Sequence, residues 1–180
     1  MNDQGIESWT PPMSVPVPWV VSLMVALEPS APWRDTYEKS AEAIARVAQS
    51  DPLFGERSEE RTAALLVAIA WYESRLRPTA KSKDGQFLCL YQLHRGHLPD
   101  PQRALDEPEV CTRAAIKIIR ASLQQCAARP ADDRLAQFVS GACDKGLVDS
   151  RYRMFLAGKL LREHPLPNAS GDGGAPPAPR

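Results

Sequence analysis

The sequence predicts a mainly α-helical domain with at most a small β-hairpin. Apolar residues recur every three or four positions over residues 33–49, 109–127 and 150–164, which is the spacing of one helix face. Residues 63–72 are apolar at every position, and a helix that is apolar all round is buried all round. Strand signals are confined to the surroundings of Asp84-Gly85, a dipeptide typical of tight β-turns.

Residues 1–32 are predicted to form an extended N-terminal arm that contains a short helix. The first 18 residues are rich in proline and lack periodicity, which is typical of a segment without a fixed fold. Residues 19–27 are almost wholly apolar and follow Pro18, whose missing N–H costs little at a helix start. We expect the compact domain itself to span residues 33–164 and a disordered tail to span residues 165–180.

The first half of the domain is predicted to hold two helices. In residues 33–49 the inward side chains are Tyr37, Ala41, Ile44, Ala45 and Ala48. Ser58 is a predicted N-cap for the next helix, since two glutamates follow it in the first turn and favour the helix dipole. That helix should run to about residue 76, because Pro78 steers the residue before it away from helical geometry.

The second half alternates loops with helices. Residues 79–87 are turn-rich, and residues 88–92 are too short a run for periodicity to distinguish strand from helix. A proline-rich loop over residues 95–108 precedes the helix over residues 109–127. Its predicted buried stripe comprises Cys111, Ala114, Ala115, Ile118, Ile119, Ser122 and Cys126. A shorter helix is expected over residues 132–141. The last helix should turn four residues inward, namely Tyr152, Phe155, Leu156 and Leu160.

Charge and composition exclude several partners. The chain has 22 basic and 22 acidic residues without a basic block, so we expect no nucleic-acid partner. The apolar run over residues 15–27 is too short to span a bilayer and contains two prolines, so no membrane span is expected. We expect a monomer.

Four cysteines, at positions 89, 111, 126 and 143, are too few for a disulfide scaffold in a chain of 180 residues. There is no CxxC pair and the three histidines are scattered, so neither a metal nor another cofactor is expected. Cys111 and Cys126 share one predicted helix and would lie ~22 Å apart, beyond disulfide reach. We expect free, buried thiols. A bridge from Cys143 to Cys111 or to Cys126 is the alternative.

Glu73 directly follows the buried apolar run and is the candidate catalytic residue. An unpaired, ionised carboxylate is costly to bury, so such a group is usually partnered, neutral or functional. A carboxylic acid at the mouth of an apolar cleft suits a general acid. The alternative is a helix-end carboxylate that pairs with Arg75 or Arg77.

The residues after Glu73 carry a resemblance to a known family. Glu73-Ser74 is followed by Pro78, Ala80, Ser82, Gly85 and Leu90-Tyr91-Gln92. This order resembles the lytic transglycosylase branch of the lysozyme-like superfamily, which has Glu-Ser, then Pro-x-Ala-x-Ser, a glycine-rich turn, and Gly-Leu-aromatic/Met-Gln. Two departures are that Cys89 replaces the glycine and that the turn is one residue longer. Phe138-Val139-Ser140-Gly141 aligns with a Tyr-Asn-Ala-Gly segment, with Phe138 replacing the tyrosine.

The resemblance implies cleavage of the β-1,4 bond between N-acetylmuramic acid and N-acetylglucosamine in peptidoglycan. Glu73 would act first as acid and then as base, taking a proton from the muramoyl 6-hydroxyl as a 1,6-anhydro ring closes. It implies substrate-binding roles for Ser82, Tyr91, Gln92 and Phe138, with Tyr91 stacking on a sugar ring. The alternatives are turn capping by Ser82 and core packing by Tyr91 and Gln92. No aspartate stands at a motif position, which favours transglycosylation over hydrolysis.

Three other functions stay open at this stage: a hydrolysing lysozyme or endolysin of the same fold, a non-catalytic cell-wall-binding component of a phage or secretion apparatus, and a helical interaction module without a glycan role. We expect the protein to act in the periplasm or at the cell wall. Residues 1–12 lack the basic region of a signal peptide. Delivery by phage lysis machinery, by a virion or secretion apparatus, or by a leader that this sequence lacks is therefore expected.

Overall fold

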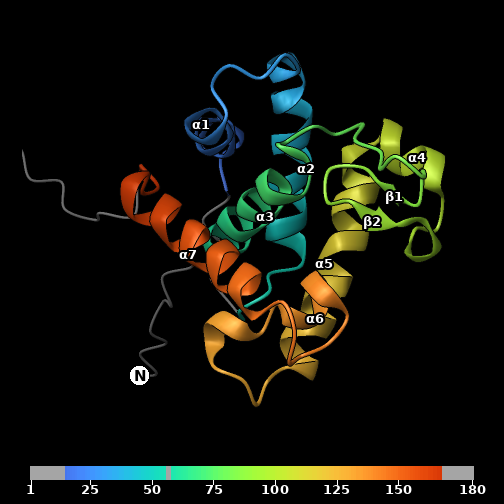
Figure 1. Ribbon diagram of the computed structural model, residues 1–180. Helices are drawn as coiled ribbons and strands as arrows, with labels where there is room; N and C mark the ends of the chain where they lie inside the picture. Colours follow the sequence, from blue (N-terminus) through green and yellow to red (C-terminus); the bar gives the residue numbers. More distant parts are fainter. Residues whose placement is uncertain (1–14, 56–57, 168–180) are drawn as a thin grey trace, which may run out of the picture.

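The computed structural model describes residues 15–55 and 58–167, and it confirms the mainly α-helical fold with a small β-hairpin (Figure 1). The helices are α1 (Val17–Leu27), α2 (Tyr37–Ser50), α3 (Glu59–Ser74), α4 (Pro101–Asp106), α5 (Pro108–Gln125), α6 (Ala136–Ser140) and α7 (Leu147–Glu163). The strands β1 (Phe87–Leu88) and β2 (Leu93–His94) pair antiparallel, with Phe87 opposite His94. Short 3₁₀ turns cover Arg34–Thr36, Arg95–His97 and Ala131–Asp133.

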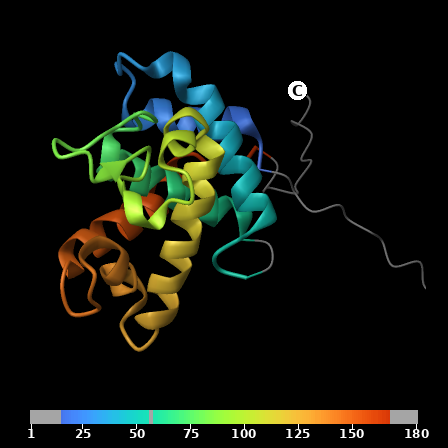
Figure 2. The same cartoon turned by 90° about the vertical axis from the view of Figure 1, so that its right-hand side faces the viewer.

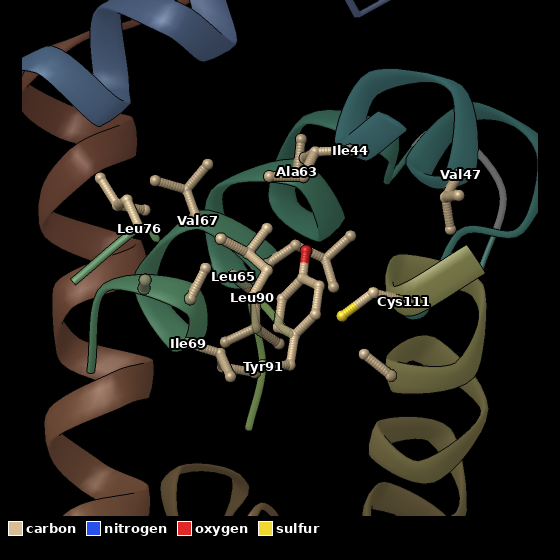
Figure 3. Close-up of a cluster of buried hydrophobic side chains, with 14 of the residues drawn as sticks. Ile44, Val47, Ala63, Leu65, Val67, Ile69, Leu76, Leu90, Tyr91 and Cys111 are labelled. Atoms are coloured by element: carbon tan, nitrogen blue, oxygen red, sulfur yellow. The ribbon is translucent and has the colours of Figure 1, made fainter. Parts of the chain in front are cut away.

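Helix α3 lies at the centre of the fold, in contact with α1, α2 and α7 (Figure 1). All of its residues from Thr62 to Ala70 are at most 1% exposed, as its unbroken apolar sequence predicts. Leu65 and Ile69 of α3 meet Leu90 and Tyr91 in the core, beside Cys111 of α5 (Figure 3). Burying each such side chain contributes about 1.5–3 kcal/mol relative to leaving it in water. The core therefore fixes the α3 end that carries Glu73.

Helix α1 belongs to the same core rather than to an arm outside the domain. Trp19 and Leu23 are buried, and the Trp19 indole N–H donates to the carbonyl of His164 at 2.8 Å. This bond joins the beginning and the end of the described chain, so the domain starts before residue 33. Residues 1–14 of the predicted arm and 168–180 of the predicted tail lie outside the described residues.

Helix α5 carries the hairpin near its first half and α6 near its end, both on the same side (Figures 1 and 2). The predicted buried stripe holds except at Ile118, which is only half-buried. The predicted helix over residues 132–141 is interrupted after the 3₁₀ turn. There the Ser150 hydroxyl donates to the Asp132 carbonyl at 2.7 Å and accepts from the Leu135 N–H at 3.1 Å. These bonds replace part of the backbone pairing that a continuous helix would use.

Helix α7 is rotated relative to its predicted orientation. Tyr152 and Phe155, predicted to face inward, are 55% and 63% exposed. Ser150, Arg153 and Ala157 face inward instead, together with Leu160 as predicted. The apolar pattern was misleading because Ser150 and Arg153 find polar partners on distant elements, which makes their burial favourable.

The orientation of α7 predicts unequal costs for two substitutions. Phe155→Ser should change the free energy of unfolding by less than about 0.5 kcal/mol, because the ring lies mostly in solvent. Leu160→Ala should lower it by about 2–5 kcal/mol, because it opens a cavity in the core. Urea denaturation of both variants measures the difference. Equal losses would mean that Phe155 is a core residue after all.

The expectation of free thiols is wrong. Cys89 is bonded to Cys111 and Cys126 to Cys143, and no free cysteine remains. The Cys126–Cys143 bridge is one of the two alternatives considered for Cys143, whereas no spacing placed Cys89 opposite α5. The bridges close segments separated by 22 and 17 positions, which stabilises the fold by about 3 kcal/mol each if the loss of chain entropy dominates. They tie the hairpin loop and the α6–α7 loop to opposite ends of α5.

None of the helices in the described ranges combines the length and the apolar content that crossing a membrane requires.

Candidate active site

An open groove with a volume of about 910 Å³ runs between the hairpin and α6. Its surface is formed by the C-terminal turn of α3, by residues 82–97, by one face of α5, and by α6. A volume of this order can hold a ligand of several rings. The five site residues predicted from the sequence all border it, namely Glu73, Ser82, Tyr91, Gln92 and Phe138.

Glu73 lies in the last turn of α3, and its side chain is 21% exposed. Its partner is Arg153 of α7, whose Nη2 donates to Glu73 Oε1 at 2.7 Å while Nε donates to the same oxygen at 3.3 Å. The alternative partners Arg75 and Arg77 stack instead on the rings of Trp71 and Trp33, so that alternative is wrong. Eighty residues separate Glu73 from Arg153, and no spacing in the sequence connects them.

The Arg153 guanidinium has two further contacts besides Glu73. Its side chain is only 9% exposed, its Nη1 donates to the Asp149 carbonyl at 2.9 Å, and its guanidinium lies 4.9 Å from the centre of the Tyr72 ring. The cation therefore has a backbone acceptor and an aromatic face in addition to Glu73. Such fixed contacts keep the guanidinium in place when the charge of Glu73 changes.

Burial raises the pKa of Glu73, and this effect outweighs the lowering by the charge and hydrogen bonds of Arg153. The charge of nearby Asp149 adds a smaller increase. Both bonds from Arg153 go to Oε1, and in the described part of the chain Oε2 has no hydrogen-bond donor. Oε2 is therefore the oxygen that is free to hold a proton.

The backbone beside Glu73 is strained. Among the described residues, four that are not glycine have positive φ: Arg75 (55°), Leu76 (62°), Cys89 (63°) and Gln92 (47°). The first two directly follow the end of α3, and the other two flank Leu90-Tyr91. Each such conformation costs of order 1–3 kcal/mol and persists only where neighbouring contacts impose it. Concentration of strain in two adjoining segments is typical of functional sites.

Three contacts impose these conformations. The Ser74 hydroxyl donates to the Leu90 carbonyl at 2.7 Å and joins the two strained segments. The Trp33 indole N–H donates to the Arg75 carbonyl at 3.0 Å. The bond from Cys89 to Cys111 fixes the second segment on α5. Ser74, taken from the sequence only as part of a motif, thus connects the catalytic candidate to the hairpin loop.

The φ of 63° at Cys89 favours glycine, the residue that the resembling pattern carries at this position. We predict that Cys89→Gly/Cys111→Ala is more stable than Cys89→Ala/Cys111→Ala by about 0.5–1 kcal/mol. Both variants lose the same disulfide. The left-handed backbone costs alanine about 1–2 kcal/mol, more than the roughly 0.5–1 kcal/mol of extra entropy that glycine loses. Urea denaturation compares the pair, and equal stabilities would exclude strain at this position.

Two of the predicted substrate-binding residues have identifiable roles in the structure itself. The Ser82 hydroxyl donates to Asp84 Oδ1 at 2.6 Å and accepts from the Phe87 N–H at 2.9 Å, so it closes the turn as the turn-capping alternative predicts. Tyr91 is 1% exposed and its ring packs among core side chains (Figure 3). The predicted stacking of Tyr91 on a sugar is corrected: neither face of the ring is free.

Gln92 and Phe138 remain available to a ligand. Gln92 is half-buried and its Nε2 donates to the Cys89 carbonyl at 3.2 Å, while its Oε1 accepts no bond in the described ranges. Phe138 is half-buried on α6, and its N–H donates to the Ser122 hydroxyl at 2.9 Å. Gln92 thus offers a hydrogen-bond acceptor on the hairpin side, and Phe138 offers an apolar ring on the opposite side.

Sequence reasoning missed much of the groove wall. Phe87 is 44% exposed, and its ring lies edge-on to that of His94, its partner across the hairpin, with ring centres 5.6 Å apart. The centre of the His97 ring lies 5.9 Å from the centre of the His94 ring. The Asp84-Gly85 turn signalled the hairpin, but strands of two residues carry no alternation that would reveal which side faces a ligand. On α5 the missed residues are Lys117, Ile118, Ala121 and Gln125.

Comparison with models of protein families, with curated proteins and with solved structures gives no match. Within the described residues, histidine, cysteine, aspartate and glutamate form no cluster of three or more that could hold a metal ion.

Proposed function

We propose that the protein is a peptidoglycan lytic transglycosylase with a lysozyme-like fold and that Glu73 is its general acid and base. One observation carries the proposal: a carboxyl group with a raised pKa, 21% exposed, at the wall of an open groove. The substrate bond is the β-1,4 link between N-acetylmuramic acid and N-acetylglucosamine. The resemblance around Glu73-Ser74 and Leu90-Tyr91-Gln92 supports this choice of polymer.

In the first step, protonated Glu73 donates its proton to the glycosidic oxygen while the bond from that oxygen to the muramoyl C1 breaks. The sugar ring acquires oxocarbenium character, and Glu73 becomes a carboxylate. In the second step that carboxylate takes the proton from the muramoyl 6-hydroxyl, whose oxygen bonds to C1 and closes the 1,6-anhydro ring. Glu73 is then protonated again and no water is consumed. Arg153, already in contact with Oε1, stabilises the carboxylate between the steps.

The other carboxylates near the groove support ring closure over hydrolysis. Among the described residues that border the groove, Glu73 is the only one with an acidic side chain. Asp84 accepts from the Ser82 hydroxyl and from the Gln86 N–H, and these bonds lower its pKa. Asp100 caps α4. Most hydrolysing glycosidases use a second carboxylate as nucleophile or base, and in the part of the chain that the structure describes no second carboxylate borders the groove.

Product analysis tests the proposal. Purified cell-wall sacculi are digested with the protein, and the released muropeptides are weighed by mass spectrometry. Each chain end from transglycosylation is one water lighter than the hydrolysed end. The anhydro product is expected. The hydrated product would assign a hydrolysing lysozyme of the same fold instead.

The ion pair to Arg153 favours a second candidate, a wall-binding component that does not cleave. A guanidinium 2.7 Å from Oε1 stabilises the charged form of Glu73 and thereby opposes proton donation. Binding of the protein to sacculi without release of soluble muropeptides would assign this function. Failure to bind sacculi would leave a helical module without a glycan role.

A further inference from the structure

The groove border carries one cation that no part of the described chain neutralises. Lys117 of α5 is exposed and forms none of the ion pairs between described residues. Its neighbours on the helix differ: Arg113 pairs with Glu109 at 2.8 Å and Arg120 with Asp51 at 2.6 Å. The surrounding charges therefore stabilise both arginines, whereas the Lys117 ammonium is left to solvent or to a ligand.

Lys117 stands on the face of α5 that borders the groove. Ile118, Ala121 and Gln125 share that face, and residues four apart on a helix lie one above the other. Exposed His94 and His97 border the same groove from the hairpin side. The negative charge at the groove is that of Glu73. Arg153 compensates this charge when Glu73 is ionised, and the charge is absent when Glu73 is protonated. A ligand therefore meets uncompensated positive charge on α5.

We propose that Lys117 recognises a carboxylate on the glycan, a specificity that rests on the proposed function. The N-acetylglucosamine units of such a polymer are uncharged. Carboxylates occur at the muramoyl units, either as the free lactyl group or within the peptide stem attached to it. Lys117 selects muramoyl-containing strands over neutral chitin-type strands, because an ammonium–carboxylate contact forms with the first alone.

Binding assays with three hexasaccharides test the selection and locate the carboxylate. The ligands are N-acetylglucosamine hexamer, muramoyl strands freed of peptide, and muramoyl strands with peptide stems. Glu73→Gln protein is used throughout so that no strand is cleaved. We expect it to bind at least one muramoyl ligand about three- to tenfold more tightly than the neutral hexamer, as for one partly solvated charge contact.

The variant Lys117→Met in this background should lose that selectivity while its affinity for the neutral hexamer stays unchanged. Loss confined to the stem-bearing strand would place the carboxylate in the peptide. Loss confined to the peptide-free strand would place it on the lactyl group, which an attached stem converts to an amide, and loss with both would mean that Lys117 reaches a carboxylate in either position. Lys117→Arg should retain most of the selectivity. Lys159→Met is the matched control, since Lys159 lies on α7, pairs with Glu163, and does not border the groove. Unchanged melting temperatures establish that each variant is folded.

Equal binding of all three ligands, or an equal loss for all three in Lys117→Met, would overturn the role of Lys117. If the active protein still releases anhydro muropeptides, only this inference falls. If the Glu73→Gln protein binds no ligand and the unmodified protein releases no product, the proposed function falls together with it.

Discussion

Glu73→Gln is expected to lower the rate of sacculus cleavage by about 10²–10⁴-fold, the usual contribution of general acid–base catalysis. The amide cannot donate a proton to the glycosidic oxygen or remove one from the 6-hydroxyl. The fold should persist, because the amide oxygen can still accept from Arg153, which lies 2.7 Å from Oε1. Release of soluble muropeptides measures the rate, and circular dichroism verifies the fold.

The matched control is Glu38→Gln, the same chemical change at an exposed position of α2, far along the chain from the groove residues. It should cleave sacculi at the unmodified rate. Cleavage by Glu73→Gln within a factor of about three of the unmodified protein would exclude Glu73 as the acid, since such a change is less than 1 kcal/mol of barrier.

The sequence predicts those parts of the fold that local pattern determines. The all-apolar run in α3 predicts a buried helix. Glu73 directly follows this run, which predicts that it lies at the boundary between core and loop. The Asp84-Gly85 turn places the hairpin. Each of these depends on residues close together in the chain, so that spacing and propensity decide the outcome.

The errors all arise where distant residues decide. Ser150 and Arg153 turn inward on α7 because they find partners around Asp132 and at Glu73, which no local pattern shows. Cys89 meets Cys111 because the hairpin loop folds onto α5. Tyr91 matches an aromatic position of a motif, yet its ring packs in the core with Leu65 and Ile69 of α3 (Figure 3). The sequence therefore identified Glu73 as a candidate acid, but it did not identify Arg153, which lowers the pKa of Glu73.

Arg153→Met should destabilise the protein by about 2–3 kcal/mol at pH 7, because it leaves the partly buried Glu73 without its cation. Loss of one partner from a fully buried pair costs about 3–5 kcal/mol, and the 21% exposure of Glu73 reduces that cost. The corresponding fall in melting temperature is roughly 5–10 °C. Arg103→Met is the control: its pair with Glu107 is exposed, so its loss should lower the melting temperature far less than the loss of Arg153 does.

The sign of the pH dependence follows from the direction of the shift. Burial holds the pKa of Glu73 above its unfolded value, so its contribution to stability is present below the unfolded pKa and is lost as pH rises through the folded pKa. Removing Arg153 removes a lowering influence and raises the pKa of Glu73 further. The destabilisation by Arg153→Met should therefore shrink below about pH 4, where Glu73 is protonated in both proteins.

Activity provides the readout that a purely structural role would not change. If protonated Glu73 is the acid, cleavage declines as pH rises through its pKa, and in Arg153→Met this decline should begin at higher pH than in the unmodified protein. Arg153→Lys keeps the charge and should leave the profile closer to its original position. The double variant Glu73→Gln/Arg153→Met should lose less stability than the two single losses added together, because no carboxylate remains to be left unpaired. A folded Arg153→Met protein whose pH profile does not move would show that Arg153 holds α7 against α3 without setting the charge of Glu73.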